Sequence, residues 1–159
     1  MNSMETVNVV FAGIGGQGVI LASDLLTAAA FRSGYDVKKS ELHGMSQRGG
    51  SVSSDVRFGK KVWSPMIPEG EADYLVSLAE DQVEVFRHLL KPGGVLLSPS
   101  LFGDYDPGRS MNLAMLGALN VHLRFDDAIW EQLIRETFPD EKLLTVNQEA
   151  FRKGASFVK

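Results

Sequence analysis

Two glycine-rich segments hold the residues with the most chemical potential. Residues 13–18 read Gly-Ile-Gly-Gly-Gln-Gly and follow a run of residues that favour a β-strand. Residues 41–52 bring the imidazole of His43 and the guanidinium of Arg48 into one segment with two hydroxyls and three glycines. Neither segment contains a redox-active side chain. We therefore predict that the chain presents groups to a reacting molecule whose redox chemistry it does not itself perform.

The first segment has the spacing of a loop that holds an anion. A glycine turn between a strand and a helix exposes unpaired backbone N–H groups, and the helix dipole favours negative charge there. The candidate binding residues are Gly13, Gly15, Gly16, Gln17 and Gly18. In the alternative interpretation, these glycines only allow the first helix to pack closely on the sheet.

The same spacing also occurs in dinucleotide-binding proteins, but the rest of that fingerprint fits this chain poorly. A dehydrogenase needs an acidic residue about 20 residues further on, at the end of the second strand. Asp36 lies at the start of the predicted second strand, and Glu41 lies beyond its predicted end. Gln17 also stands where such loops more often have a small or apolar residue. A free-standing Rossmann-like nucleotide-binding protein is therefore an alternative interpretation of the chain, and a non-catalytic assembly or regulatory module is a further one.

The second segment is a candidate site for orienting a substrate. His43 can act as an acid or a base near neutral pH. Arg48 can hold a carboxylate or a phosphate through two parallel hydrogen bonds. The neutral donors and flexible backbone positions around them are Ser46, Gln47, Gly49, Gly50 and Ser51. In the structural alternative, His43 bonds to a turn carbonyl and Arg48 forms a surface ion pair of little energetic consequence.

Composition restricts the class of protein. The chain of 159 residues has 16 Lys and Arg against 20 Asp and Glu, a net charge of −4, which argues against a nucleic-acid partner. It has no cysteine, so this chain cannot bind iron–sulfur clusters or zinc through thiolates. Residues 1–8 lack the pattern of a signal peptide, and no apolar run approaches the roughly 20 residues of a membrane span. We expect a cytoplasmic protein without membrane partners, and no metal site, because His88 and His122 lack neighbouring ligands.

Strand and helix patterns alternate along the chain, which predicts an α/β fold. Strands are expected at residues 7–12, 36–39, 51–58, 73–77 and 95–97, with a tight turn at Gly59 and Lys60 leading into a hairpin strand at 61–63. Helices are expected at residues 19–31, 81–90, 111–121, 127–138 and 146–154. We predict that residues 1–159 form a single Rossmann-like three-layer domain, with a mostly parallel sheet plus a β-hairpin.

The apolar run at residues 111–121 contains three small residues, Ala114, Gly117 and Ala118. Small side chains allow another helix to approach closely. That helix could belong to the core of the same chain or to a second copy, in a homodimer of the isolated chain. The core is the simpler interpretation.

These segments together resemble the catalytic gamma domain of the pyruvate/ketoisovalerate oxidoreductases, within the 2-oxoacid:ferredoxin oxidoreductases. The resemblance covers nearly the whole chain and rests on residues 13–18, 41–52, 56–58, 64–73 and 116–118. Residues 43–52, His-Gly-Met-Ser-Gln-Arg-Gly-Gly-Ser-Val, are its most specific part and resemble the indolepyruvate branch. The connection between residues 97 and 111 is shorter than in the family, where an extra strand is expected.

The resemblance implies a subunit of an enzyme that oxidatively decarboxylates a 2-oxoacid, of the indolepyruvate or aryl-pyruvate type, to an acyl-CoA and passes electrons to ferredoxin. It implies that thiamine diphosphate, Mg²⁺ and 4Fe–4S clusters reside on a larger alpha subunit, with CoA as co-substrate. None of these cofactors is expected on this chain alone, which contributes orientation and electrostatics. His43 and Arg48 would support the partner's active site. Arg48 and the glycine loop would steer an anionic group of the 2-oxoacid or of CoA.

Overall fold

Five strands form one sheet in the order β2-β3-β1-β4-β5. The computed structural model describes residues 5–43 and 50–159. The strands are β1 (Val7–Ile14), β2 (Asp36–His43), β3 (Ser51–Gly59), β4 (Ala72–Ser77) and β5 (Leu90–Leu97). β1, β4 and β5 are parallel neighbours, whereas β3 runs antiparallel to both β1 and β2. The predicted α/β class is confirmed, and the sheet is mixed because β3 is inserted between β1 and β2.

The sequence predicted a β-hairpin across the turn at Gly59, but in the structure the hairpin is formed by the two strands that precede this turn. β2 and β3 form the hairpin, in register from Asp36 opposite Gly59 to His43 opposite Val52. Both edges of β3 are therefore occupied, and residues 61–63 have no free edge of β3 with which to pair. The segment is instead held by side chains, because the Asp36 carboxylate accepts a hydrogen bond from the backbone N–H of Val62 at 2.8 Å.

The connection from β3 to β4 is anchored by two polar side chains of β3. Arg57 donates from Nη1 to the carbonyl oxygens of Ser64 and Met66, at 3.0 Å each. The Asp55 carboxylate accepts from the backbone N–H of Ile67 at 3.1 Å. Burial raises the pKa of Asp55 above its ordinary value, although this hydrogen bond acts in the opposite direction.

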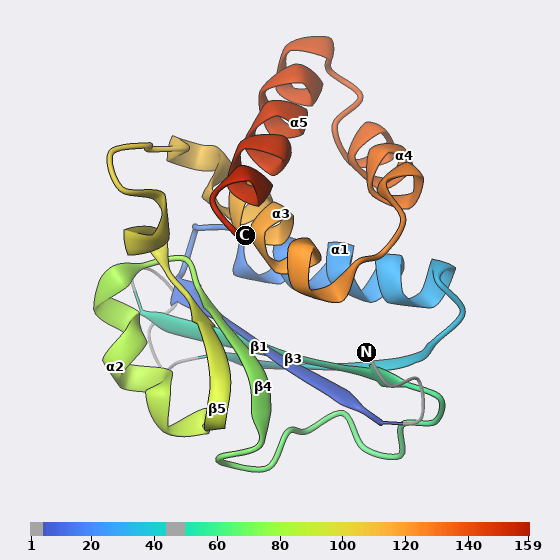
Figure 1. Ribbon diagram of the computed structural model, residues 1–159, viewed down its shortest axis with the longest axis vertical. Helices are drawn as coiled ribbons and strands as arrows, with labels where there is room; N and C mark the ends of the chain where they lie inside the picture. Colours follow the sequence, from blue (N-terminus) through green and yellow to red (C-terminus); the bar gives the residue numbers. More distant parts are fainter. Residues whose placement is uncertain (1–4, 44–49) are drawn as a thin grey trace.

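The helices cover the two faces of the sheet unequally (Figure 1). The helices of the larger layer are α1 (Val19–Arg32), α3 (Met111–Leu123), α4 (Asp127–Thr137) and α5 (Glu141–Ser156). The opposite face carries the short α2 (Val83–Phe86), between the 3₁₀ turns Glu80–Gln82 and Arg87–Leu89. The helix predicted at 81–90 is thus reduced to one α-helical turn, because the backbone is already extended at Leu90, where β5 begins. No described helix combines the length and apolar character needed to cross a membrane.

β1 separates two hydrophobic clusters. Val9 and Phe11 belong to the large core on the α1 side, whereas Val10 and Ala12 belong to a small cluster on the α2 side. All four are fully buried, as expected for a strand covered on both faces. The layers are therefore three, with most of the apolar side chains on one side.

The small residues of α3 serve contacts within the chain. A Cβ at Gly117 would lie 1.9 Å from the carbonyl oxygen of Phe151, and a Cβ at Gly154 would lie 1.9 Å from that of Ala114. The backbones of α3 and α5 therefore touch, which requires glycine at both positions. The core interpretation of residues 111–121 is confirmed.

Gly117→Ala should lower the free energy of unfolding by about 3 kcal/mol, because the added methyl overlaps backbone atoms that only a shift of a whole helix could move. Chemical denaturation measures this loss. Thr145→Ala, at an exposed position of α5, is the matched control and should be close to neutral. Equal stability of the two variants would contradict the close packing of α3 on α5.

Candidate functional site

The two glycine-rich segments meet at one edge of the sheet. The backbone N–H of Gly15 donates to the carbonyl oxygen of Gly50 at 2.9 Å. The pairing of β1 with β3 places Ile14 opposite Ser51. β2 is parallel to β1, because both are antiparallel to β3, so β2 ends with His43 at this same edge. This is the edge at which parallel strands end, the usual position of ligand sites in α/β sheets.

The structure does not describe several of the predicted site residues. Ser46, Gln47, Arg48 and Gly49 lie outside the described residues. The structure describes His43 only as the last residue of β2. The described part of the candidate site therefore consists of residues 13–18, Gly50 and Ser51, and the polar residues around them.

The glycines of the first loop have different roles. Gly16 and Gly18 have φ angles of 94° and 84°, in the left-handed region that favours glycine. Gly13 is required for packing, since a Cβ there would lie 2.8 Å from Cγ2 of Val19. Close packing therefore accounts for Gly13 and backbone conformation for Gly16 and Gly18, whereas the anion-binding role of the loop stays a prediction.

Gln17 braces the loop against the sheet. Its Oε1 accepts from the backbone N–H of Ile14 at 2.8 Å, and its Nε2 donates to the carbonyl oxygen of Leu78 at 3.4 Å. The side-chain amide therefore connects the ends of β1 and β4. The glutamine that departs from the simple dinucleotide pattern has a structural use.

A shallow hollow of about 310 Å³ adjoins the loop, lined by Ile14, Gly15, Gly16, Gly18, Val19, Ile20, Leu21 and Val52. No side chain caps the amino terminus of α1. The first helical hydrogen bond runs from the N–H of Ala22 to the carbonyl of Gly18, so the preceding N–H groups have no partner within the helix. These groups and the helix dipole give the hollow a partial positive charge.

Polar side chains that the sequence analysis did not single out complete this edge. Ser51 Oγ donates to Oε1 of Gln82 at 2.5 Å, which ties the start of β3 to the turn after β4. Glu80 accepts from Ser98 Oγ at 3.3 Å and from the backbone N–H of Ser100 at 3.0 Å. The ends of β4 and β5 are thereby joined.

A signal for most of these residues was present in the sequence. Glu80 and Gln82 come just after the predicted strand at 73–77, and Ser98 follows the one at 95–97. Because the carboxyl ends of parallel strands share one edge, such residues belong to the candidate site. Asn112, whose Nδ2 donates to the carbonyl of Gly18 at 3.4 Å, gave no comparable signal, because it lies in an apolar helix.

The described part of the site can bind and orient, and the redox groups of the expected enzyme do not fit it. The chain contains no cysteine. Within residues 5–43 and 50–159, no three His, Asp or Glu side chains gather in an arrangement that could hold a metal ion. The groups at the edge are neutral donors, backbone amides and one carboxylate that is already hydrogen-bonded, and the role predicted for them remains the positioning of an anion.

Sequence comparisons relate this chain to known proteins. The profile of the family described as "Pyruvate ferredoxin/flavodoxin oxidoreductase" matches residues 8–107. Indolepyruvate oxidoreductase subunit IorB of Thermococcus kodakarensis is 47% identical over 97 residues, which cover 60% of this chain and 47% of that protein. Pyruvate synthase subunit PorC of Methanothermobacter thermautotrophicus is 31% identical over 178 residues and 92% of each chain. The matched part thus spans about half the length of the indolepyruvate relative.

Solved structures share the fold. The gamma subunit of keto/oxoacid ferredoxin oxidoreductase from Geobacter sulfurreducens superposes with a TM-score of 0.78 at 24% identity, over 96% of this chain and 95% of that one. Pyruvate oxidoreductase subunit PORC from Thermotoga maritima has a TM-score of 0.78 at 22% identity, over 98% of both chains. At these identities the similarity establishes the architecture alone.

Gln17→Ala should lower the free energy of unfolding by about 1–3 kcal/mol, because the N–H of Ile14 loses its acceptor. The amide of Ile14 should also exchange its hydrogen faster. Chemical denaturation and hydrogen exchange measure the two effects. The control is Gln132→Ala, at an exposed position of α4, and a loss no larger than in this control would show that Gln17 does not brace the loop.

Proposed function

This chain belongs to the pyruvate ferredoxin/flavodoxin oxidoreductase family, and we propose that it is the gamma-type subunit of a 2-oxoacid:ferredoxin oxidoreductase of the indolepyruvate or aryl-pyruvate type. The complete enzyme would convert a 2-oxoacid to an acyl-CoA with release of CO₂ and transfer of electrons to ferredoxin. The observation that carries the proposal is the hydrogen bond from Gly15 to Gly50. It brings the two segments on which the family resemblance rests to a single edge of the sheet.

The amino-acid composition of this chain indicates which cofactors another subunit would have to bind. Iron–sulfur clusters need thiolate ligands, and the chain has none. We therefore assign the clusters to a larger alpha subunit in a cytoplasmic complex, and the family resemblance implies thiamine diphosphate with Mg²⁺ on that subunit as well. Residues 1–159 would act as one gamma-type domain that covers the partner's active site. Bound by the partner, these cofactors would supply the decarboxylation and electron-transfer chemistry, while this chain would bind and orient.

The role of this chain is to position an anion beside that active site. The uncapped first turn of α1 and the glycine amides attract the carboxylate of a 2-oxoacid or a phosphate of CoA. Arg48 would add a bidentate contact to the same group. His43, at the end of β2, would stand beside it as a donor to the carbonyl oxygen or as a proton carrier.

The strand order weighs against the alternative of a free-standing dinucleotide-binding protein. In that fold the second strand is adjacent to the first, and its terminal acid reaches the ribose of the nucleotide. Here β3 lies between β1 and β2, which moves the end of β2 one strand further from the glycine loop, by roughly 5 Å. Glu41, near that end, is also paired with Lys39.

An anaerobic affinity capture from the native lysate tests the proposal directly. We expect recovery of a large partner subunit that contains iron and thiamine diphosphate, identified by mass spectrometry and by assay of both cofactors. Recovery of the chain alone, combined with measurable binding of NAD or NADP by calorimetry, would support the nucleotide-binding alternative instead.

Arg48→Ala should reduce kcat/KM of the captured complex for the 2-oxoacid or for CoA by roughly tenfold to a hundredfold, the usual value of a charge-assisted hydrogen bond. Its melting temperature should stay unchanged. Arg135→Ala, which removes the same charge from an exposed position of α4, is the control and should retain full activity. Normal kinetics with Arg48→Ala would remove this residue from the site.

A further inference from the structure

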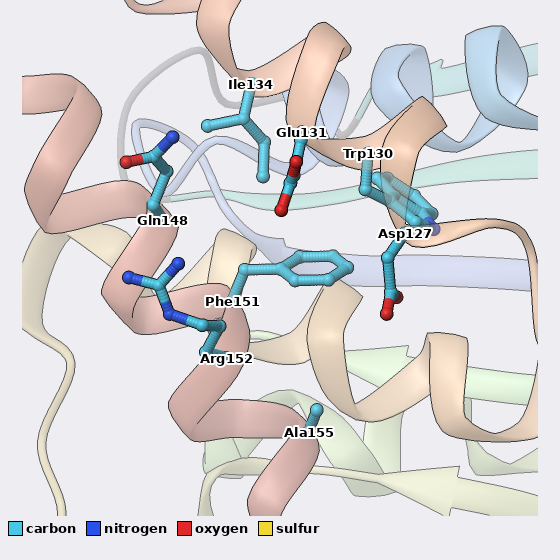
Figure 2. Close-up of a pocket in the computed structure, with 8 residues that line it drawn as sticks. All are labelled: Asp127, Trp130, Glu131, Ile134, Gln148, Phe151, Arg152 and Ala155. Carbon is cyan, nitrogen blue, oxygen red and sulfur yellow. The ribbon is translucent and has the colours of Figure 1, made fainter.

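A second pocket lies between α4 and α5, in the helical layer and on residues that the candidate site does not use. It has a volume of about 230 Å³. Figure 2 shows the side chains that line it: Asp127, Trp130, Glu131, Ile134, Gln148, Phe151, Arg152 and Ala155.

The pocket has an apolar floor and a charged rim. Trp130, Ile134 and Phe151 form the floor and are buried, with the rings of Trp130 and Phe151 5.1 Å apart. On the rim, Glu131 of α4 extends between the helices above the ring of Phe151 (Figure 2). Gln148 and Arg152 of α5 lie on the other side of the pocket from Glu131, and the amide of Gln148 points away from the guanidinium of Arg152 (Figure 2). Opposite charges thus flank an apolar surface.

These polar groups have no partners within the described part of the chain. Arg152 and Glu131 form no ion pair there, although Glu136 of the same helix α4 pairs with Arg32 at 2.8 Å. The indole nitrogen of Trp130 is the one buried side-chain polar atom of the described residues that lacks a hydrogen-bond partner. That nitrogen is inaccessible from the pocket, so the unpartnered groups that a ligand can reach are the charged side chains of the rim.

We propose that this pocket binds an α-amino acid with an aromatic or branched apolar side chain. The guanidinium of Arg152 and the amide of Gln148 suit a carboxylate, and the carboxylates of Glu131 and Asp127 suit an ammonium group. The floor suits the apolar side chain. An α-amino acid is the small molecule that joins these three groups at one carbon atom.

The size and the charges of the pocket select against other ligands. Sites for drug-sized molecules occupy roughly 300–1,000 Å³, so about 230 Å³ corresponds to a single amino acid rather than a peptide or a nucleotide. A 2-oxoacid has no ammonium group and would gain no contact with the solvent-exposed carboxylates of Glu131 and Asp127. The pocket is therefore distinct in chemistry from the anion-holding edge.

The amino acid is a chemical precursor of the 2-oxoacid substrate of the proposed reaction. It carries an amino group where the substrate has its oxo group, so a transamination, which exchanges this amino group for the oxo group of a second 2-oxoacid, supplies the substrate from it. A pocket on this subunit would sense the supply of that precursor. This role rests on the proposed function, whereas the binding itself does not.

Tryptophan fluorescence of the full-length chain tests the binding. Trp63→Phe removes the exposed tryptophan and leaves Trp130 as the only one of the two in the sequence. Phenylalanine and leucine should change its emission saturably, with a dissociation constant on the order of 1 mM. 3-Phenylpropionate and 2-phenylethylamine, which each lack one charge, should bind about tenfold more weakly. Binding of 3-phenylpropionate as tight as that of phenylalanine would overturn the proposal.

Variants on the rim locate the bound ligand. Arg152→Ala and Glu131→Gln should each weaken phenylalanine binding about tenfold, with unchanged melting temperature in the absence of ligand. Arg135→Ala and Glu149→Gln, at exposed positions of the same two helices that do not line the pocket, should bind as the parent does. Equal binding by the rim and control variants would refute the site. Calorimetry on the captured complex repeats the test, so loss of the partner and loss of the amino acid are separate results.

Discussion

The double burial of β1 is the constraint on which the rest of the structure depends. Val9, Val10, Phe11 and Ala12 are each 0% exposed, and the strand pairs with β3 on one edge and with β4 on the other. A strand so enclosed must be covered by layers on both faces. After β1, the chain reverses direction in a loop and continues as α1, which packs over the sheet. That reversal creates the glycine loop and aims the amino terminus of α1 at the edge of the sheet.

The antiparallel pairing of β3 with β1 then determines what lies beside this loop. It places Gly50 and Ser51 next to the end of β1, and Gln82 and Glu80 connect the neighbouring strand ends to them. The result is an edge made of backbone amides and neutral donors on rigid strands, a combination suited to holding an anion in a fixed position. Electron transfer requires cofactors that such an edge cannot ligate, which is why the proposed activity belongs to a complex.

The helical layer is organised by a different contact, the touching backbones of α3 and α5 at Gly117 and Gly154. α4 packs on both α1 and α5, and a pocket lies between α4 and α5. The two regions thus separate two kinds of chemistry. The sheet edge presents donors to an anion, whereas the helical pocket presents both charges over an apolar floor.

The sequence by itself determined the local elements and the limits on chemistry. The residue patterns predicted all five strands of the sheet, but they ended the second at residue 39 and began the fifth at residue 95, and they added a strand at 61–63 that the structure does not contain. The last helix was predicted from residue 146, whereas the structure begins it at Glu141, after the cap formed by Asp140. The lack of cysteine excluded thiolate-bound iron–sulfur clusters from this chain. Only the tertiary structure decided the insertion of β3 between β1 and β2, the bracing role of Gln17 and the pocket between α4 and α5. The physical reason is the distance along the chain over which each kind of interaction acts. Periodicity, capping and turn chemistry act within a few residues, whereas strand order and helix contacts depend on which edges and faces distant segments leave free.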